Sequence, residues 1–413
     1  MTKKILIGAV VFFLIAAGIA GYLLFFRQSA TPGSTNGQGT NPTGYQPFPV
    51  VSGGNQTVSP GQTTGTTSTS VAATTVTIQT LTHLYASPIA GAGVTSSKAG
   101  EFVQLTDRAT GHMYSIALAT SSTVAITPIS DQTIPEIYSS LWLGASTTLL
   151  RYLDSKESTI KTYSATLITQ KKTSTTTSTL PIISGSFLPD NIETVVANPA
   201  QTQIFYLTTS ADGVTGKIAS GSGTKASTIF TSAISDWNVQ WPAASTIALS
   251  TKPASVARGY LYFLSTTGTV KRILGDIPGL VINVDPSTNF VAYSENTPTL
   301  SILNSKTGSS EALGINTIAD KCAWSQVQKG VLYCAMPQGI PGGHYPDAWY
   351  QGLVSFSDSI VRVDANTGQV STVANVSKQA GQAIDVENLT ASPKDDYLIF
   401  TNKSDLSLWA LRL

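Results

Sequence analysis

Apolar residues follow two patterns in this chain, and the first is a single long run. The 22 residues from Ile5 to Phe26 contain no charge, and such a run can cross a hydrocarbon core about 30 Å thick as a helix. Two lysines precede the run and only one arginine follows it closely. By the positive-inside rule, residues 1–4 should be cytoplasmic and everything after the run should lie outside the cytoplasm. The sequence therefore predicts a single-pass protein of the cell membrane with a transmembrane helix over residues 5–26.

A cleaved signal peptide is the alternative interpretation of this run. Signal peptides have an apolar region of about 7–15 residues followed by a small-residue cleavage site. The run here is longer, although Gln28-Ser29-Ala30 offers a weak cleavage context. We therefore favour a signal anchor that stays in the protein.

A polar tract follows the apolar run. Residues 27–73 consist mainly of Gly, Ser, Thr, Asn, Gln and Pro, and their few apolar residues show no helical or strand period. Such a segment cannot bury enough surface to offset its chain entropy. The sequence predicts a disordered stalk here.

From Thr74 onward, short apolar runs alternate with turns rich in Gly, Pro, Asn and Ser. The runs are mostly β-branched and aromatic, which predicts an all-β fold for residues 74–413. One unit recurs, in which an apolar strand, a proline, a short polar turn and a second apolar strand follow in order. Clear copies occupy residues 193–210, 238–252, 281–296 and 388–403.

The spacing of these copies indicates a propeller. The prolines of the first three copies are 43 and 44 residues apart. A fifth copy over residues 321–337 has Gln326 at the matching place, and two divergent copies around Gly144 and Pro88 make seven. A period of about 40–45 residues with four strands per unit is typical of propeller blades. The sequence therefore predicts a seven-bladed β-propeller, with six or eight blades, or a row of β-sandwiches, as alternatives.

Two further features complete the predicted ring. Thr-Gly pairs at Gly268, Gly308 and Gly368 predict tight turns between third and fourth strands, because glycine supplies the positive φ that such turns need. The last copy ends after three strands, whereas a spare strand, residues 74–82, precedes the first copy. Pairing of this spare strand with the last blade would close the ring and leave no open edge.

The proline-containing units resemble the TolB-like, or PD40, subgroup of WD40-like propellers, whose blades carry a Ser-Pro-Asp-Gly turn between their first two strands. The closest match is Ala391 to Asp395, and Asn198-Pro199 and Asp285-Pro286 are reduced versions. The resemblance covers roughly residues 74–413 and implies the fold. It implies no TolB function, because the α/β domain that precedes the propeller in TolB is not found in this sequence.

The whole layout also resembles uncharacterised single-pass, membrane-anchored propeller proteins of bacteria. The shared words are residues 186–191, 349–360 and 400–403. This resemblance implies no known activity.

Cys322 and Cys334 are the only cysteines, and they fall on the two strands of one predicted hairpin. Counting outward from the turn places them opposite each other or one position apart, within the Cα distance that a disulfide requires. Outside the cytoplasm such a bond would persist. We expect a structural disulfide, with two buried free thiols as the alternative.

An insertion between the second and third strands of the cysteine-containing blade, residues 338–358, gathers the most candidate binding groups. Aromatic rings with polar groups suit ligand and partner sites, and long loops on rigid scaffolds often carry function. In a propeller this connection lies on the face of an entrance to the central channel. Alternatively, the aromatic rings pack inward over the blade. The candidate ligand- or partner-binding residues are His344, Tyr345, Asp347, Trp349, Tyr350 and Gln351.

Composition limits the partners. Charged residues are 11% of the chain and the net charge is +1, so the clustered Lys and Arg that nucleic acids require are missing. We expect no nucleic-acid partner. Two cysteines and three histidines without ligand spacing argue against a metal site, and we expect neither metal nor cofactor.

No catalytic constellation is evident in the sequence. Glycosidases need two carboxylates about 5–9.5 Å apart, but the candidates Asp190, Asp236 and Asp347 are scattered, and no G-x-S-x-G motif is present. We expect a binding or scaffolding module that holds an envelope protein, a peptide or a glycan near the membrane. The alternative is a propeller-fold carbohydrate-active enzyme, either a hydrolase or a lyase.

Overall fold

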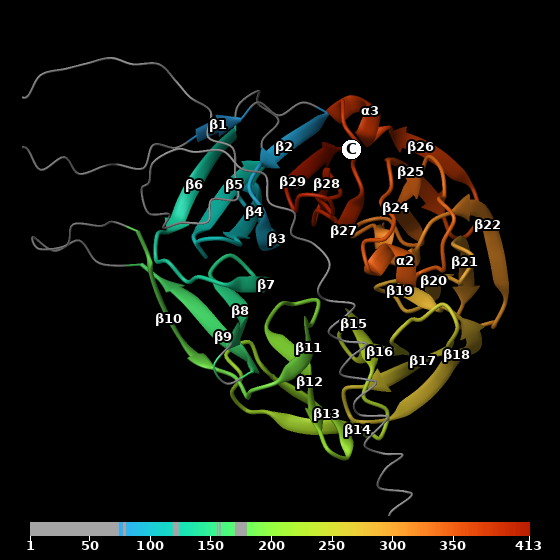
Figure 1. The fold of residues 1–413 in the computed structure, drawn as a ribbon, viewed down its shortest axis with the longest axis horizontal. Coiled ribbons are helices and arrows are strands. Elements are labelled where there is room, and N and C mark those ends of the chain that lie inside the picture. Colours follow the sequence, from blue (N-terminus) through green and yellow to red (C-terminus); the bar gives the residue numbers. More distant parts are fainter. Residues whose placement is uncertain (1–73, 77–79, 119–123, 155, 157, 170–179) are drawn as a thin grey trace, which may run out of the picture. The chain divides into compact units, whose positions relative to one another are not determined.

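Seven antiparallel β-sheets follow one another around a central axis (Figure 1). They are seen in a computed structural model that describes residues 74–76, 80–118, 124–154, 156, 158–169 and 180–413. The fold is therefore an all-β, seven-bladed propeller, which confirms the blade count predicted from the repeats. The predicted transmembrane helix and stalk, residues 5–26 and 27–73, lie outside the described residues. Within the described ranges, no helix is long and apolar enough to cross a membrane.

Each of the first six blades has four strands that follow in chain order outward from the central axis. The first blade contains β3 (Ile89–Ser97), β4 (Gly100–Asp107), β5 (Met113–Leu118) and β6 (Val124–Ser130). The second contains β7 (Ile137–Leu143), β8 (Thr147–Asp154), β9 (Thr159–Ile168) and β10 (Ile182–Phe187). The third contains β11 (Ile192–Ala197), β12 (Gln203–Ser210), β13 (Gly213–Ser220) and β14 (Ser227–Ser232).

The next three blades repeat this order. The fourth contains β15 (Trp237–Ala243), β16 (Thr246–Thr251), β17 (Arg258–Ser265) and β18 (Val270–Pro278). The fifth contains β19 (Val281–Val284), β20 (Phe290–Ser294), β21 (Thr299–Asn304) and β22 (Ser310–Asn316). The sixth contains β23 (Cys322–Trp324), β24 (Val331–Pro337), β25 (Asp358–Asp364) and β26 (Val370–Ala374).

The seventh blade closes the ring, as predicted, but with a different segment from the one expected. Its inner strands are β27 (Val386–Ala391), β28 (Tyr397–Asn402) and β29 (Leu408–Arg412), and its outermost strand is β2 (Leu81–Tyr85) from the other end of the propeller. β1 (Thr74–Val76) pairs instead with β6 and adds a fifth strand to the first blade. The spare strand predicted over residues 74–82 is thus two strands in two blades. Leu84 of β2 is 1% exposed between the seventh and first blades, so β2 adds an apolar side chain to that junction.

Each sheet is buried on both faces because it packs between two neighbours. Successive residues of a strand point to opposite faces. In β24, Leu332 and Cys334 pack toward the fifth blade, whereas Val331, Tyr333 and Ala335 pack toward the seventh. Seven clusters of buried apolar side chains result, one at each junction between neighbouring blades. Burial on both faces explains why these strands read as continuous apolar runs.

The predicted turns are confirmed, with one exception. Gly268, Gly308 and Gly368 have φ of 96°, 76° and 69° and lie between the third and fourth strands of their blades. Gly144 lies between β7 and β8, as its repeat predicts. The copy placed around Pro88 is wrong, because Pro88 precedes β3 and the first turn of that blade is Lys98-Ala99. This turn forms without a proline, so the proline pattern could not locate it.

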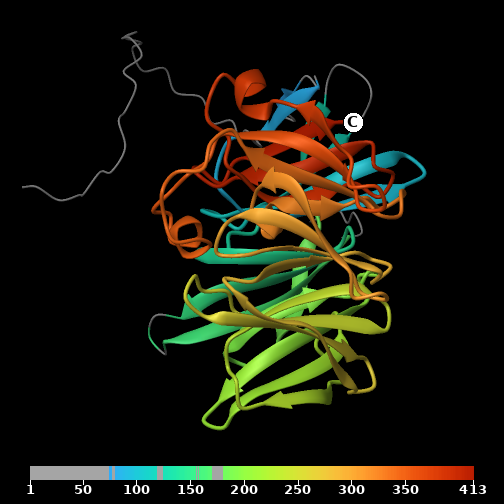
Figure 2. The same ribbon diagram turned by 90° about the vertical axis from the view of Figure 1, so that its right-hand side faces the viewer.

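Connections alternate between two faces of the propeller because successive strands are antiparallel. We call the face with the turns between first and second strands the turn face, and the opposite face the insertion face; Figure 2 shows the propeller from the side. The long connection between β24 and β25 lies on the insertion face. Three short helices also lie in connections of that face: η1 (Ala319–Lys321), α2 (Asp347–Tyr350) and α3 (Val376–Ala380).

Candidate functional site

The insertion between β24 and β25 packs over its own blade with the rings of Tyr345, Trp349 and Phe356 buried. Tyr345 and Trp349 are 3% and 2% exposed and belong to the apolar cluster between the fifth and sixth blades. The Tyr345 hydroxyl donates to the carbonyl of Pro341 at 2.7 Å. Both rings therefore have structural contacts, which is the arrangement that the alternative interpretation of this loop describes.

The other four predicted binding residues divide into two kinds. Asp347 accepts hydrogen bonds from the backbone N–H and the hydroxyl of Ser255, at 3.0 and 2.7 Å, and so ties α2 to the fourth blade. The Tyr350 hydroxyl donates to Asp320. His344 and Gln351 are exposed. The structure thus places the six residues on one short segment, where His344 and Gln351 are exposed and Asp347 and Tyr350 are partly exposed. A binding role for them stays a prediction.

A buried lysine that the sequence did not single out anchors the insertion. The side chain of Lys321 is fully buried, and its ammonium lies 2.9 Å from Asp358 and 2.5 Å from Asp385. The rings of Trp349 and Phe356 lie 4.8 and 5.1 Å from the same ammonium. The indole N–H of Trp349 donates to Asp385 at 3.1 Å. Paired charges and aromatic faces make burial of this lysine tolerable.

Acidic groups near this lysine have altered proton affinities. Burial raises the pKa of Asp358 to about 6, although Lys321 acts in the opposite direction. Burial also raises the pKa of Asp320 to about 6; the hydrogen bond from Tyr350 lowers it and the charge of Glu387 raises it. The pKa of Glu387 is itself raised by burial. None of these carboxyl groups lines the cavities described below, whereas a glycosidase pair must face its substrate.

Cys322 and Cys334 form a disulfide in the structure. They stand directly opposite each other on β23 and β24, with Cα atoms 4.0 Å apart. Both lie in the apolar cluster between the fifth and sixth blades. The bond joins the short β23 to the longer β24 beside the insertion, which fits a structural role.

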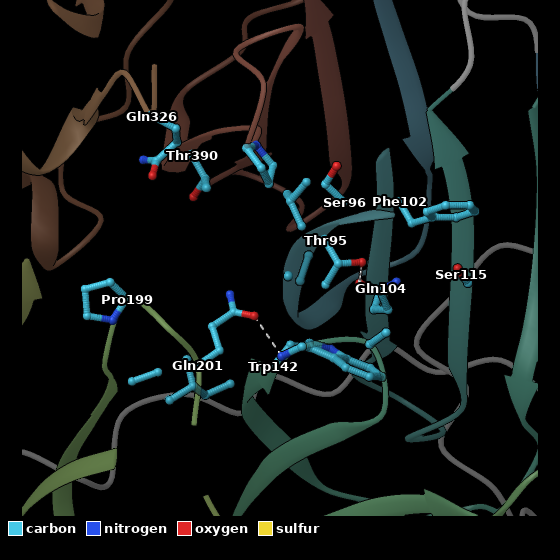
Figure 3. Close-up of a pocket in the computed structure, with 18 of the residues that line it drawn as sticks. Thr95, Ser96, Phe102, Gln104, Ser115, Trp142, Pro199, Gln201, Gln326 and Thr390 are labelled. Carbon is cyan, nitrogen blue, oxygen red and sulfur yellow. Dashed lines mark hydrogen bonds between the residues drawn. The ribbon is translucent and has the colours of Figure 1, made fainter. Parts of the chain in front are cut away.

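A large cavity lies on the turn face, away from the insertion. Its volume is about 1160 Å³, and its walls come from the first, second, third, sixth and seventh blades. Figure 3 shows labelled side chains from these blades around one open space. Two smaller cavities, of about 500 and 370 Å³, lie at the junctions of the fifth blade with the sixth and of the seventh with the first.

The large cavity combines apolar surface with uncharged polar groups. None of the described residues that line it is Asp, Glu, Lys, Arg or His. Apolar surface comes from rings and aliphatic side chains, among them Phe102, Pro199 and Pro393. Hydroxyl and amide groups come from Thr95, Ser96, Ser97, Gln104, Ser115, Asn198, Gln201, Gln326 and Thr390.

Two glutamines present amide groups to this cavity. The Oε1 atom of Gln201 accepts from the backbone N–H of Gly144 at 2.8 Å, as the dashed line in Figure 3 shows. The Oε1 atom of Gln104 accepts from the hydroxyl of Thr95 at 3.2 Å. In each case the amide oxygen accepts a hydrogen bond from the protein, and among the described residues the amide nitrogen has no hydrogen-bond partner. Both NH₂ groups can therefore donate to a ligand.

Close packing of β3 on β7 forms one wall of the cavity. A Cβ atom at Gly91 would lie 2.1 Å from the carbonyl oxygen of Ser140, and one at Gly93 would lie 2.5 Å from the Cβ of Trp142. Only glycine permits this approach at both positions. Trp142 lines the cavity and is 3% exposed, and its indole N–H has no hydrogen-bond partner among the described residues.

Sequence reasoning missed this site because each of its residues is ordinary by itself. Its residues range from 92 to 393 and meet only when the ring forms. The one local signal is the run of small residues from Ala90 to Ser97, which the repeats marked only as a divergent copy.

Neither metal-ligating side chains nor similar proteins identify a further site. No group of three or more potential metal-ligating side chains occurs in the part of the chain that the structure describes. No protein-family model matches the chain. A search of curated proteins finds no similar sequence either.

Proposed function

We propose that this protein is a binding or scaffolding module, held at the membrane by its N-terminal helix and displayed outside the cytoplasm. The observation that carries the proposal is the cavity of about 1160 Å³ on the turn face. Its volume exceeds the range of about 300–1,000 Å³ usual for small-molecule sites, so an extended ligand fits it better than a compact one. An envelope protein, a peptide and a glycan all meet this requirement.

Membrane anchoring in this proposal rests on the sequence. The apolar run of residues 5–26 and the charge asymmetry around it support the orientation. The disulfide between Cys322 and Cys334 suits a compartment outside the cytoplasm.

We also propose that the propeller is of the TolB-like type. The support is the Ser392-Pro393-Lys394-Asp395 turn between β27 and β28. The Asp395 carboxylate accepts from the Ser325 hydroxyl and, at 2.8 Å, from the backbone N–H of Gln326. Asp395 therefore links the turns of adjacent blades. It stands at the glycine position of the Ser-Pro-Asp-Gly turn, where its φ is 59°, and Lys394 stands at the acidic position.

The proposal is tested by blocking the cavity without assuming the chemistry of the ligand. Ser96 is exposed on β3 and lines the cavity, so Ser96→Trp fills the space with an indole ring. Thr267→Trp places the same ring on an outer turn between β17 and β18 and is the matched control. Full-length protein is crosslinked mildly in membranes, and the captured partner is identified and quantified.

We expect Ser96→Trp to lose the partner that both the wild type and Thr267→Trp retain. Equal capture by all three proteins would exclude the cavity. The double variant His344→Ala/Gln351→Ala is the parallel test of the insertion, because both side chains are exposed.

A further inference from the structure

We infer that the large cavity accepts an uncharged oligosaccharide rather than a peptide or a charged glycan. This inference rests on the proposed binding function and names its ligand class. Three observations support it: the described lining residues carry no charge, they combine hydroxyl and amide groups with apolar surfaces, and the amide nitrogens of Gln104 and Gln201 have no partner among the described residues.

The described residues that line the cavity carry no charge, which disfavours charged ligands. In a cavity of partly buried groups, a ligand charge without an opposite charge loses hydration that nothing replaces. None of the described lining residues can pair with an ammonium, a carboxylate or a phosphate. Peptides, which usually bring charged side chains, and acidic or basic glycans are therefore poorly matched.

The hydrogen-bonding groups of the cavity match those of a sugar. Sugar hydroxyls donate and accept, and side-chain hydroxyls do the same. Thr95, Ser96, Ser115 and Thr390 provide such groups from β3, β5 and β27. The amide nitrogens of Gln104 and Gln201 add two donors whose paired oxygens already hold the wall together. These donors come from different blades, as Figure 3 shows, and so suit a ligand with hydroxyls on all sides.

The cavity also offers apolar surfaces on which sugar rings can pack. Sugar rings have C–H faces that pack on aromatic and proline rings. Phe102 is partly exposed in the cavity wall, and Pro199 and Pro393 border it on the third and seventh blades. Trp142 also lines the cavity, and its buried indole N–H has no acceptor among the described residues, whereas buried donors of this kind normally have one.

Substitutions at Thr390 isolate the effect of charge. Thr390 is exposed on β27 and lines the cavity. Thr390→Glu adds a negative charge, and Thr390→Gln adds a side chain of the same size without one. Binding of full-length protein in detergent is measured by calorimetry with the neutral hexasaccharides chitohexaose, maltohexaose and cellohexaose. The cationic chitosan hexamer differs from chitohexaose only in lacking its acetyl groups.

We expect at least one neutral hexasaccharide to bind the wild type, and the chitosan hexamer to bind more weakly. Thr390→Glu should weaken neutral binding roughly tenfold and strengthen chitosan binding, whereas Thr390→Gln should leave both within about twofold. This exchange of preference cannot arise from misfolding.

Three outcomes would overturn the inference. If Ser96→Trp abolishes capture of a partner but no neutral hexasaccharide binds the wild type, the binding function stands and the ligand is of another class, such as a peptide. If neutral hexasaccharides bind equally well to the wild type and Ser96→Trp, the sugar site lies elsewhere. If neither oligosaccharide binding nor partner capture responds to Ser96→Trp, the proposed function of the cavity fails as well.

Discussion

At the scale of single residues, side chains of the insertion differ sharply in what surrounds them. Trp349 packs in the core, donates to Asp385 and lies against the ammonium of Lys321. His344 and Gln351, a few positions away, are exposed. Adjacent positions in the same predicted site therefore serve stability in one case and remain free for contacts in the other.

Replacement of Trp349 should unfold the protein more easily. We expect Trp349→Ala to lower the free energy of unfolding by about 3–5 kcal/mol, because it leaves a cavity and removes a partner of buried charges. His344→Ala/Gln351→Ala should change it by less than about 0.5 kcal/mol. Urea denaturation of the full chain measures both. A small loss for Trp349→Ala would mean that the ring contributes little to the core and is available for binding.

The raised pKa of Asp320 predicts a pH dependence of stability. Its pKa in the folded protein is about 6, above the usual value of 3.8. The folded state therefore binds a proton more tightly than the unfolded chain, so ionisation of Asp320 costs stability as the pH rises from about 4 to 6, and this loss persists above pH 6. Asp320→Asn keeps an acceptor for Tyr350 and removes the charge.

We expect Asp320→Asn to be more stable than the wild type at pH 7.5, by on the order of 1 kcal/mol, and to lose most of this advantage at pH 4. Asp212→Asn, at an exposed position, serves as the control and should show no such trend. Urea titrations at the two pH values give the comparison. An Asp320→Asn protein that is less stable at both would show that the charge makes favourable contacts.

At the scale of elements, hydrogen bonds connect the turns of neighbouring blades. Asp395 holds the turn of the sixth blade, and Gln201 holds that of the second. Glu101 of the first blade accepts from the backbone N–H of Lys394 of the seventh at 2.9 Å. Such contacts couple the sheets on the turn face, where the large cavity lies.

The disulfide is a covalent link between two strands of one blade, β23 and β24. Cys322 and Cys334 enclose a short loop, and such a bond stabilises the fold by about 2–3 kcal/mol by restricting the unfolded chain. We expect Cys322→Ala/Cys334→Ala to unfold at a lower temperature than the wild type. A reducing agent should lower the melting temperature of the wild type and leave that of the variant unchanged. If the agent lowered both equally, the effect would not come from this bond.

Elements of this fold were predictable to the extent that they follow local rules. Proline turns and the Thr-Gly pairs at Gly268, Gly308 and Gly368 mark hairpins because backbone geometry requires those residues. The first blade was misplaced in the sequence because its turn at Lys98-Ala99 contains neither a proline nor a Thr-Gly pair. The cavity and the burial of Lys321 could not be predicted, because their partners come from distant parts of the chain.

At the scale of the whole molecule, stability comes from a ring of interfaces rather than from one central core. Seven apolar clusters lie between neighbouring blades, so each blade buries its two faces against two neighbours. The junction of the seventh and first blades closes this ring. It contains an apolar cluster around Leu84. Within the seventh blade, β2 pairs with β29, and His83 stacks on Trp409 with ring centroids 4.2 Å apart on the face toward the sixth blade.

Weakening this junction should therefore affect the whole propeller. Leu84→Ala removes a side chain that is 1% exposed, and we expect it to lower the free energy of unfolding by about 2–5 kcal/mol. Val256→Ala, at a site that is 90% exposed, is the control and should have little effect. Because loss of the closing strand exposes neighbouring blades on both sides, far-ultraviolet circular dichroism and tryptophan fluorescence should report one transition at a shifted urea midpoint. A Leu84→Ala protein with the wild-type midpoint would mean that β2 does not hold the ring closed.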